Sequence, residues 1–511
     1  MIHVPVKVKL PFLWGKAVFK KDDWPQVNLI VGPNGSGKTL IAESLGGQFA
    51  DSGYSVDFFK ADRKQDDSYL SILRDNEIVR ARIEYVLSNM FGKSIVFTED
   101  SEGTFVPVVK NKAWNVEYDL NKVECHGLKE IITLLVALYS HTKKSCLIFD
   151  EPELHLHPQL QVFFINEIKK CARQNPDRMF FLITHSPFFI DLRYPEDLLG
   201  VIVCHINREP THIDSLSKED DGIFRRFLPR FNTYHKQFFF SDNQIFVEGY
   251  TDQQMFTYLL PYIHNSYSAV GTGIIDVGGK DELGVFCKVC SLLGTDGRII
   301  TDLDSLFSGK LRDVFCNDSR VIQWLEKQEE KQQDFYSAIF TPKELHQKIT
   351  LEKLIQKLEK YLIMTGHYIC NYKGSVPRKL RNFFEKLLAI ENKYNGAENI
   401  DTYKTVVLQG ILKTEEELKK FLPRNLSENL VFIKNLYRIT LAGAEAARVY
   451  ILPKGCIEHY YMQTKNDYMP ISGKDKLFHT EREHLMHTSR KNIQKDYAGL
   501  IEILEKACAR V

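Results

Sequence analysis

VNLIVGPNGSGKT, residues 27–39, is an apolar strand that runs into a glycine-rich loop and then into a helix predicted to begin at Lys38. The loop fits the pattern G-x-x-x-x-G-K-[ST], in which glycines let backbone N–H groups surround phosphates at a helix N-terminus. In such loops the lysine reaches the terminal phosphates of a nucleotide and the final hydroxyl binds Mg²⁺. The predicted nucleotide-binding residues are Asn34, Gly35, Ser36, Gly37, Lys38 and Thr39.

Two later strand ends supply the other groups that a nucleotide site needs. LIFDEPE, residues 147–153, is an apolar strand ending in acids, and the predicted strand Phe180–Ile183 is followed by Thr-His-Ser at 184–186. Because ligands bind at the carboxyl ends of parallel strands, these residues should face the phosphate loop. We expect Asp150 to bind the magnesium through water, Glu151 to polarise the attacking water and His185 to sense the γ-phosphate. The predicted cofactor is ATP with Mg²⁺.

A second series of strand ends is acidic. FVEGYTD at 246–252, IDVGG at 275–279 and IITDLD at 299–304 each join an apolar strand to acids or glycines, and Gly278 would permit a tight turn. Parallel strands would bring Glu248, Asp252, Asp302 and Asp304 to one edge. Carboxylates so close together cannot all ionise without a cation between them. Hard oxygen ligands suit Mg²⁺ or Mn²⁺, and two such ions can promote phosphodiester cleavage.

Composition sets limits on the remaining functions. The 511 residues, 44% hydrophobic and 26% charged, suit several soluble domains, and no apolar run of 18 residues predicts a membrane span. The net charge of +1 means that any nucleic-acid surface must be a local patch. Scattered cysteines suit a reduced cytoplasm, and the C-x-x-C pair Cys287 and Cys290 suits helix packing better than zinc. The candidate basic patches are Arg225, Arg226, Arg230 and Lys236, and Lys373, Arg378, Lys379 and Arg381.

Alternating strands and helices predict an α/β chain with largely parallel sheets, first over the N-terminal half and again from Gln244 to about Phe307. Residues 62–118 are less regular and suggest an insertion or lobe. The segment 310–447 is charged and helical.

The motifs together resemble a known family. The phosphate loop, DEPELHLHP at 150–158 and Thr-His-Ser at 184–186 look like the ABC ATPase head of SMC-like and OLD-family proteins. The acidic strand ends resemble the TOPRIM domain of topoisomerases, primases and OLD-family nucleases. Joined in this order over roughly 25–310, they resemble the OLD family specifically. The resemblance implies an ABC-type P-loop ATPase head at 1–235, a TOPRIM core with a Rossmann-like parallel sheet at 236–310, a helical insertion or dimerisation region at 311–447, and a C-terminal part at 448–511 that completes the TOPRIM site.

The resemblance also assigns roles to residues of the TOPRIM part. It implies that Glu248 and Asp252 bind one metal and that Asp302 and Asp304 bind the other or share it. Glu458, in KGCIE at 454–458, is the late acidic ligand that the family places near the metals, although an ordinary helix N-terminal acid is the alternative. A catalytic lysine is also implied, and the candidates Lys474, Lys476 and Lys491 stay open.

For the ATPase part, the resemblance implies that two heads dimerise around ATP. Cys125-His126-Gly127 stands at the signature loop but departs from the usual Ser-Gly-Gly, which predicts slow hydrolysis without loss of binding. Gln65 is the candidate for the glutamine loop. His155 and His157 are expected in a dimer-contacting loop rather than as a metal pair.

Two functions of different class follow. The first is an ATP-regulated, metal-dependent DNA endonuclease of the OLD type, cytoplasmic, homo-oligomeric through its heads, and active in bacterial anti-phage defence, alone or with a partner such as a reverse transcriptase and its retron DNA. The second is an SMC-like ATPase that clamps or scaffolds nucleic acid with an inactive TOPRIM domain. The complete acidic set favours the nuclease. A topoisomerase or primase is a third option, but no strand-breaking domain is recognisable.

Overall fold

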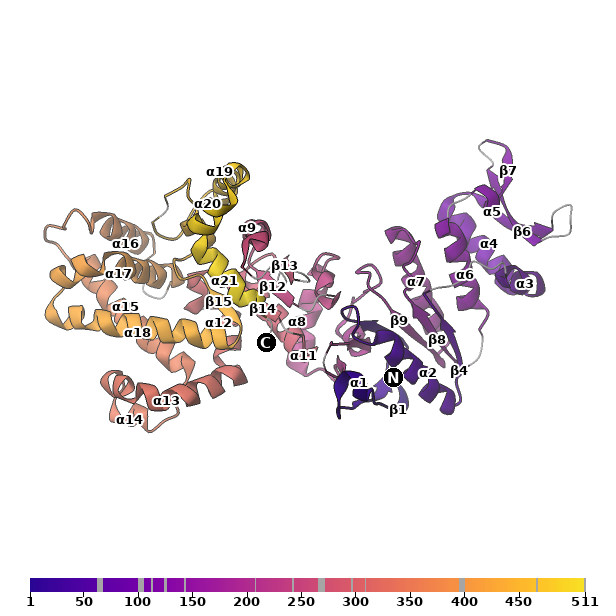
Figure 1. Cartoon of the computed structure of the whole chain (residues 1–511), viewed down its shortest axis with the longest axis horizontal. Helices are drawn as coiled ribbons and strands as arrows, with labels where there is room; N and C mark the ends of the chain where they lie inside the picture. Colours follow the sequence, from indigo (N-terminus) through magenta and orange to yellow (C-terminus); the bar gives the residue numbers. More distant parts are fainter. Residues whose placement is uncertain are drawn as a thin grey trace. The chain divides into compact units, whose positions relative to one another are not determined.

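The computed structural model describes residues 1–61, 68–99, 105–111, 114–123, 126–141, 144–206, 208–240, 243–264, 272–295, 297–307, 309–394, 400–465 and 467–509. The chain forms two compact units, Met1–Asp242 with Leu292–Gly294, and Asn243–Ser291 with Thr295–Val511 (Figure 1). The predicted fold class is confirmed: parallel α/β sheets precede a helical region. Within the described residues, no helix is both long and apolar enough to cross a membrane.

A six-stranded sheet organises the first unit. Its order is β11-β10-β3-β9-β8-β4, and every neighbouring pair is parallel except β10 with β11. All residues of β8 and β9 are buried, as expected for strands covered on both faces. Register places Ile183 beside both Ile30 and Asp150, so the loops after β3, β8 and β9 leave the same edge. The strands are β3 (Val27–Val31), β4 (Ser55–Phe59), β8 (Ser145–Asp150), β9 (Arg178–Ile183), β10 (Val201–Val203) and β11 (Thr211–His212).

Aromatic packing fixes this sheet against the helix that follows the phosphate loop, which carries Phe49. Trp24, Phe49 and Phe181 are fully buried and meet edge to face, with ring centroids 5.4–5.7 Å apart. The indole of Trp24 donates to the Val4 carbonyl at 2.9 Å, which satisfies its one polar atom. The surrounding elements are β1 (Ile2–Val8), α1 (Pro11–Trp14), β2 (Phe19–Trp24), α2 (Lys38–Asp51), α6 (His126–Tyr139), α7 (Pro158–Gln174) and α8 (Lys218–Phe227).

The less regular sequence pattern over 62–118, which suggests an insertion or lobe, gives regular secondary structure in the described residues. This segment contains two helices and a three-stranded antiparallel sheet of order β5-β6-β7. The second helix is capped by Asn76, whose side chain accepts from Val79 N, and β6 alternates buried and partly buried residues. Charged residues between these short elements obscure their periodicity. The elements are α3 (Ser68–Asp75), α4 (Glu77–Phe91), β5 (Ser94–Glu99), β6 (Phe105–Asn111), β7 (Val116–Asp119) and α5 (Leu120–Val123).

The second unit contains a four-stranded, wholly parallel sheet of order β13-β12-β14-β15. Its last strand comes from far along the chain, since Val449 pairs with Ile299 and Ile451 with Thr301. The segments on either side of the helical region therefore form one sheet. The elements are β12 (Asn243–Val247), α9 (Tyr250–Leu259), β13 (Thr272–Asp276), α11 (Lys280–Leu292), β14 (Gly297–Thr301), β15 (Val449–Ile451), α19 (Lys474–His487), α20 (Arg490–Asp496) and α21 (Ala498–Cys508).

The predicted helical region is confirmed and forms a bundle. Helix α15 buries Leu351, Leu354, Ile355, Leu358 and Leu362, the spacing of one helical face. A Cβ at its Gly366 would lie 2.5 Å from the Tyr403 hydroxyl, so α15 and α17 approach closely there. The helices are α12 (Lys310–Cys316), α13 (Ser319–Ile339), α14 (Pro342–Leu345), α15 (Leu351–Asn371), α16 (Arg381–Lys393), α17 (Asp401–Phe421) and α18 (Arg424–Ala446).

Candidate nucleotide and metal sites

The phosphate loop has the geometry that its sequence predicts. Gly35 and Gly37 adopt φ values of +79° and +82°, which side chains with a Cβ rarely adopt. The Lys38 ammonium is buried and donates to the carbonyl oxygens of Gly32 at 3.1 Å and Pro33 at 2.8 Å. Burial lowers the pKa of Lys38. The loop therefore holds a buried cation at the start of α2, where terminal phosphates bind in such loops.

The two oxygen groups predicted to hold magnesium in the ATPase part lie together. Thr39, in the first turn of α2, donates its hydroxyl to Asp150 Oδ2 at 3.1 Å. Asp150 ends β8, so the strand and helix deliver a hydroxyl and a carboxylate to one point. Oxygen ligands of this kind are those that Mg²⁺ prefers.

Glu151 and His185 also meet at this edge. Glu151 Oε1 lies 3.8 Å from His185 Nε2, and burial together with the Lys38 charge lowers the pKa of His185, which keeps the imidazole neutral near pH 7. Sequence reasoning missed Glu153, which accepts from the Thr184 hydroxyl at 2.9 Å and from the His185 backbone N–H at 2.6 Å. Glu153 thus connects the loop after β8, which carries Glu151, to the loop after β9, which carries His185. These hydrogen bonds fix the position of His185.

Glu153→Ala is expected to slow ATP hydrolysis about 10-fold while changing ATP affinity much less. The variant removes a charge-assisted hydrogen bond of about 1.5 kcal/mol that holds the histidine loop, but leaves the phosphate loop intact. Steady-state hydrolysis and a nucleotide titration would measure the two effects. Glu153→Gln, which keeps one acceptor, should fall between the wild type and Glu153→Ala. An unchanged turnover number for Glu153→Ala would show that Glu153 does not position His185 for hydrolysis.

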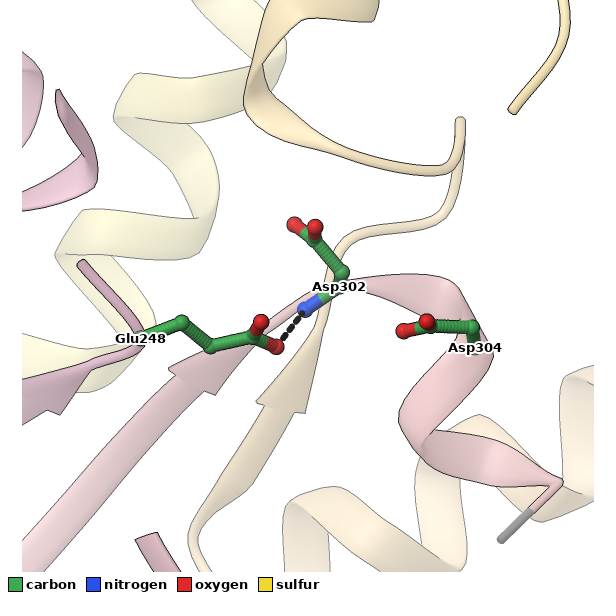
Figure 2. A group of neighbouring side chains, drawn as sticks. All are labelled: Glu248, Asp302 and Asp304. Carbon is green, nitrogen blue, oxygen red and sulfur yellow. Dashed lines mark hydrogen bonds between the residues drawn. The ribbon is translucent and has the colours of Figure 1, made fainter. Parts of the chain in front are cut away.

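The acidic site of the second unit gathers three of the predicted carboxylates. Glu248, Asp302 and Asp304 each offer an oxygen within 4.8 Å of the others (Figure 2). Glu248 follows β12, and the two aspartates follow β14. Glu248 Oε1 accepts from Asp302 N at 3.0 Å and from the Thr301 hydroxyl at 2.5 Å, so the strand end itself orients this carboxylate. The parallel register of β12 with β14 explains the convergence.

Asp252 and Glu458 lie around this cluster rather than in it. Asp252, in the first turn of α9, has its pKa raised to about 7 by burial and by the charge of Glu248. Glu458 is fully buried, and the Lys474 ammonium lies 3.5 Å from its Oε1. A fully buried carboxylate needs a compensating positive charge, which a lysine or a metal cation can supply.

Of the three candidate lysines, Lys474 is the one that reaches the acids. Its Nζ lies 3.6 Å from Asp302 Oδ2 and 3.5 Å from Glu458 Oε1. Burial disfavours the charged form, but these carboxylates outweigh it and the pKa of Lys474 is raised. Lys476 and Lys491 have exposed side chains on α19 and α20.

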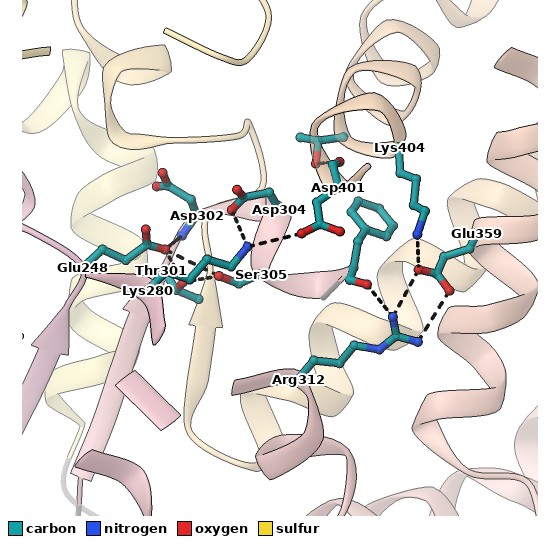
Figure 3. Close-up of polar contacts among 12 residues, drawn as sticks. Glu248, Lys280, Thr301, Asp302, Asp304, Ser305, Arg312, Glu359, Asp401 and Lys404 are labelled. Carbon is teal, nitrogen blue, oxygen red and sulfur yellow. Dashed lines mark hydrogen bonds and ion pairs between the residues drawn. The ribbon is translucent and has the colours of Figure 1, made fainter. Parts of the chain in front are cut away.

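A second lysine at the site was not predicted. Lys280, the first residue of α11, lies 3.3 Å from Asp304 Oδ1 and 3.9 Å from Asp401 Oδ2 (Figure 3). It follows Gly278 and Gly279, whose φ values of +76° and +141° form the tight turn expected at Gly278. The glycine pair was therefore the sequence feature that could have pointed to Lys280. Its partner Asp401 could not have been found in this way, because it lies in the helical region.

The balance of charge suits a divalent cation. Glu248, Asp252, Asp302, Asp304 and Glu458 face two lysines, Lys280 and Lys474. Burial and then the charges of Glu248 and Asp252 raise the pKa of Asp302 well above its usual value, and burial raises that of Asp304. Such raised pKa values mean that the ionised carboxylates lack enough nearby positive charge to compensate them. The donor set, all oxygen, fits Mg²⁺ or Mn²⁺.

Asp252→Asn is expected to stabilise the metal-free chain at pH 8, by about 1.5 kcal/mol or about 3–6 °C in unfolding midpoint. Because the pKa of folded Asp252 is raised to about 7, the folded state holds this proton more tightly than the unfolded chain. The stability that protonation contributes is therefore present at low pH and lost as pH rises from about 4 to about 7. Asparagine stays neutral and avoids this loss.

Thermal unfolding at pH 8 and pH 5 in chelator would measure the Asp252→Asn effect, and the gain should shrink at the lower pH. Asp281→Asn, which removes an exposed acid on α11, is the matched control and should show no gain. A gain for Asp252→Asn that is equal at both pH values would contradict a titrating Asp252.

The remaining sequence candidates are placed as follows. Arg225 forms ion pairs with Glu196 and Asp221, and Lys379 pairs with Glu417. Cys287 and Cys290 both lie on α11 as free thiols. His157 caps α7, and His155 has a positive φ of 64° in the loop before it. Gln65 and Cys125 lie outside the described residues.

Comparison with known families agrees with this organisation. Residues 124–191 match a family model described as "AAA domain, putative AbiEii toxin, Type IV TA system". Residues 239–304 match the "Overcoming lysogenization defect protein-like, TOPRIM domain". No curated protein matches the sequence.

Solved structures with similarity to the chain include the SMC head domain from Thermotoga maritima, at 13% identity and TM-score 0.30, over 42% of this chain and 100% of that one. Stu0660 of Streptococcus thermophilus shows 13% identity and TM-score 0.23 over 39% and 73%. A complex of archaeal ribosomal stalk protein aP1 and ribosome recycling factor aABCE1 shows 11% and 0.24 over 41% and 41%.

The two family matches fall on the two sites described above, since one contains Asp150, Glu151 and His185 and the other contains Glu248, Asp302 and Asp304. The chain thus joins an AAA-type ATPase region to an OLD-like TOPRIM domain, which is the domain combination of an OLD-family ATPase–TOPRIM protein.

Proposed function

We propose that this chain is an ATP-binding, Mg²⁺- or Mn²⁺-dependent DNA endonuclease. The observation that carries the proposal is the convergence of Glu248, Asp302 and Asp304 at one sheet edge, with Lys474 beside Asp302. A phosphodiester needs a cation to offset the charge that develops when water attacks it, and this edge is built to hold one. The ATPase region supplies the regulatory nucleotide site.

The residues would divide the chemistry between them. Glu248, Asp302 and Asp304, with Asp252 and Glu458 beside them, would hold the metal, which when bound activates water and neutralises phosphate charge. Lys474 keeps its proton because its pKa is raised. Its ammonium can therefore offset negative charge on the phosphate and on the leaving oxygen. The Asp302 backbone N–H donates to Glu248 and so holds the Glu248 carboxylate close to the Asp302 and Asp304 carboxylates.

The biological setting is proposed more coarsely. A nuclease controlled by a nucleotide-binding head suits a cytoplasmic defence effector against phage, acting on DNA as a homodimer or larger homo-oligomer through its heads. The chain would act alone, or with a companion such as a reverse transcriptase and its retron DNA that provides the trigger. Slow hydrolysis, expected from the signature position at Cys125-His126-Gly127, suits ATP as a conformational signal rather than a fuel.

The test is cutting of plasmid and single-stranded DNA with Mg²⁺, with Mn²⁺ and with chelator, each with and without ATP. Cutting that requires metal supports the endonuclease. Tight DNA binding that depends on ATP, with no cutting in any metal, would favour the SMC-like clamp with an inactive TOPRIM domain.

A further inference from the structure

Helix α17 belongs to the helical region, yet one of its faces is polar and points to the acidic site. Asp401, Thr405, Gln409 and Lys413 recur at every fourth residue and so share that face. Among the described residues, the Thr405 hydroxyl donates within the helix, to the Asp401 carbonyl at 2.8 Å. Asp401, Gln409 and Lys413 instead contact other parts of the second unit. This polar face needs an explanation, because most helices of a bundle bury apolar residues toward their neighbours.

Gln409 makes contacts that a packing residue would not make. Its side chain is 2% exposed, its Nε2 donates to the Lys454 carbonyl at 2.7 Å, and its Oε1 accepts from Met469 N at 3.1 Å. These two backbone groups lie in different loops. The first loop leads into Glu458, and the second leads into Lys474. One amide therefore holds both loops that bring the C-terminal members of the site.

The first of these loops is also attached to the acidic turn. Gly455 O accepts from Leu303 N at 2.7 Å, and Leu303 stands between Asp302 and Asp304. Gly455 has φ +134°, and a Cβ there would lie 2.3 Å from Gln409 Nε2. The loop at Gly455 is therefore held on one side by the turn that carries Asp302 and Asp304, and on the other side by Gln409. A side chain at position 455 would not fit between them.

The N-terminal end of the same helix reaches the site independently. Asp401 pairs with Lys280, and Lys280 pairs with Asp304, so Figure 3 shows a charged chain from the acids to the helical region. Lys404, also on α17, pairs with Glu359, which in turn pairs with Arg312. Two contacts two turns apart on α17 therefore flank the site.

We propose that Gln409 is a positioning residue that sets the places of Glu458 and Lys474 relative to Asp302. The inference rests on the proposed function, since it concerns the metal-dependent site. Glu458 lies in a short 3₁₀ turn (Ile457–Tyr460), and Lys474 begins a helix after a long loop, so no strand fixes either one. Residues that orient metal ligands affect metal affinity or activity about 10–100-fold.

The experiment compares Gln409→Met with the wild type. Methionine has similar length but cannot form the hydrogen bonds to Lys454 O and from Met469 N, or the 3.3 Å contact between Gln409 Nε2 and His459 Nε2. Thr405→Val is the matched control, because it also removes a buried polar group from α17 but touches neither loop. We expect Gln409→Met to weaken Mn²⁺ binding, measured by calorimetry, and to slow DNA cutting, each about 10–100-fold. Thr405→Val should match the wild type in both.

Hydrogen exchange separates positioning from unfolding. In Gln409→Met, exchange should increase in 454–458 and 467–474 and stay unchanged in the strands β12 and β14. Exchange that rises throughout the second unit, or Mn²⁺ binding equal to that of the wild type, would overturn the role of Gln409. If the wild-type chain binds Mn²⁺ but does not cut DNA, the endonuclease proposal is wrong. The difference in Mn²⁺ affinity between Gln409→Met and the wild type would then still test the role of Gln409. A wild-type chain that binds no Mn²⁺ rejects the metal site and this inference together.

Discussion

Asp302→Ala should lower metal-dependent DNA cutting about 1000-fold or more, to background. The Asp302 carboxylate faces Glu248 and Asp304 and lies 3.6 Å from Lys474, so its loss removes both a metal ligand and the partner of the lysine. Removing about 4 kcal/mol of transition-state stabilisation corresponds to this change in rate. Single-turnover cutting of plasmid DNA across a Mn²⁺ titration would measure it.

The same variant should not unfold the chain. Burial and the charges of Glu248 and Asp252 make the ionised Asp302 unfavourable without metal, so alanine relieves repulsion. We expect an unfolding midpoint in chelator that is equal to or above that of the wild type. Asp281→Ala, an exposed acid of the same unit, serves as the control and should cut normally. Full cutting by Asp302→Ala would place the catalytic centre elsewhere.

Lys38→Ala should weaken ATP binding about 100-fold and remove measurable hydrolysis. Its ammonium is buried within the phosphate loop, and charge-assisted hydrogen bonds to phosphates contribute about 1.5–3 kcal/mol. A titration with a fluorescent ATP analogue would give the affinity. Lys20→Ala, which removes an exposed lysine from β2, should bind ATP as the wild type does. Undiminished binding by Lys38→Ala would show that the loop does not hold the nucleotide.

The effect of Lys38→Ala on DNA cutting then defines what ATP does. Cutting that falls with ATP binding means that the nucleotide activates the nuclease. Cutting that persists without ATP means that the nucleotide restrains it or serves assembly. The Asp302→Ala and Lys38→Ala variants together separate the two sites, because each leaves the other site's residues unchanged.

Local patterns predicted most residues of the two sites. Thr39 lies beside Asp150, and Glu248 lies beside Asp302 and Asp304, because the phosphate loop and these acids all follow apolar strands of parallel sheets. The order of such strands need not be known, since all their carboxyl ends lie along one edge. A lobe over 62–118 was predicted, but its individual strands and helices were not, because charged residues interrupt the apolar periodicity of this segment.

Other residues depended on contacts between distant segments. Lys474, Lys476 and Lys491 are equivalent in sequence, and only the loop before α19 decides that Lys474 reaches Asp302. The glycines before Lys280 were visible, but its partner Asp401 was not. Gln409 belongs to no recognisable sequence motif, so its role could not be predicted.

The sequence by itself therefore determined the nucleotide loop, the acidic strand ends and the order of an ATPase region, a TOPRIM domain and a helical region, because backbone periodicity and strand-end position are local properties. The tertiary structure alone decided which lysine joins the acids, how Glu153 holds His185, and how α17 grips the loops of Glu458 and Lys474. These contacts join residues far apart in the chain, and their geometry is set by packing, which no local pattern encodes.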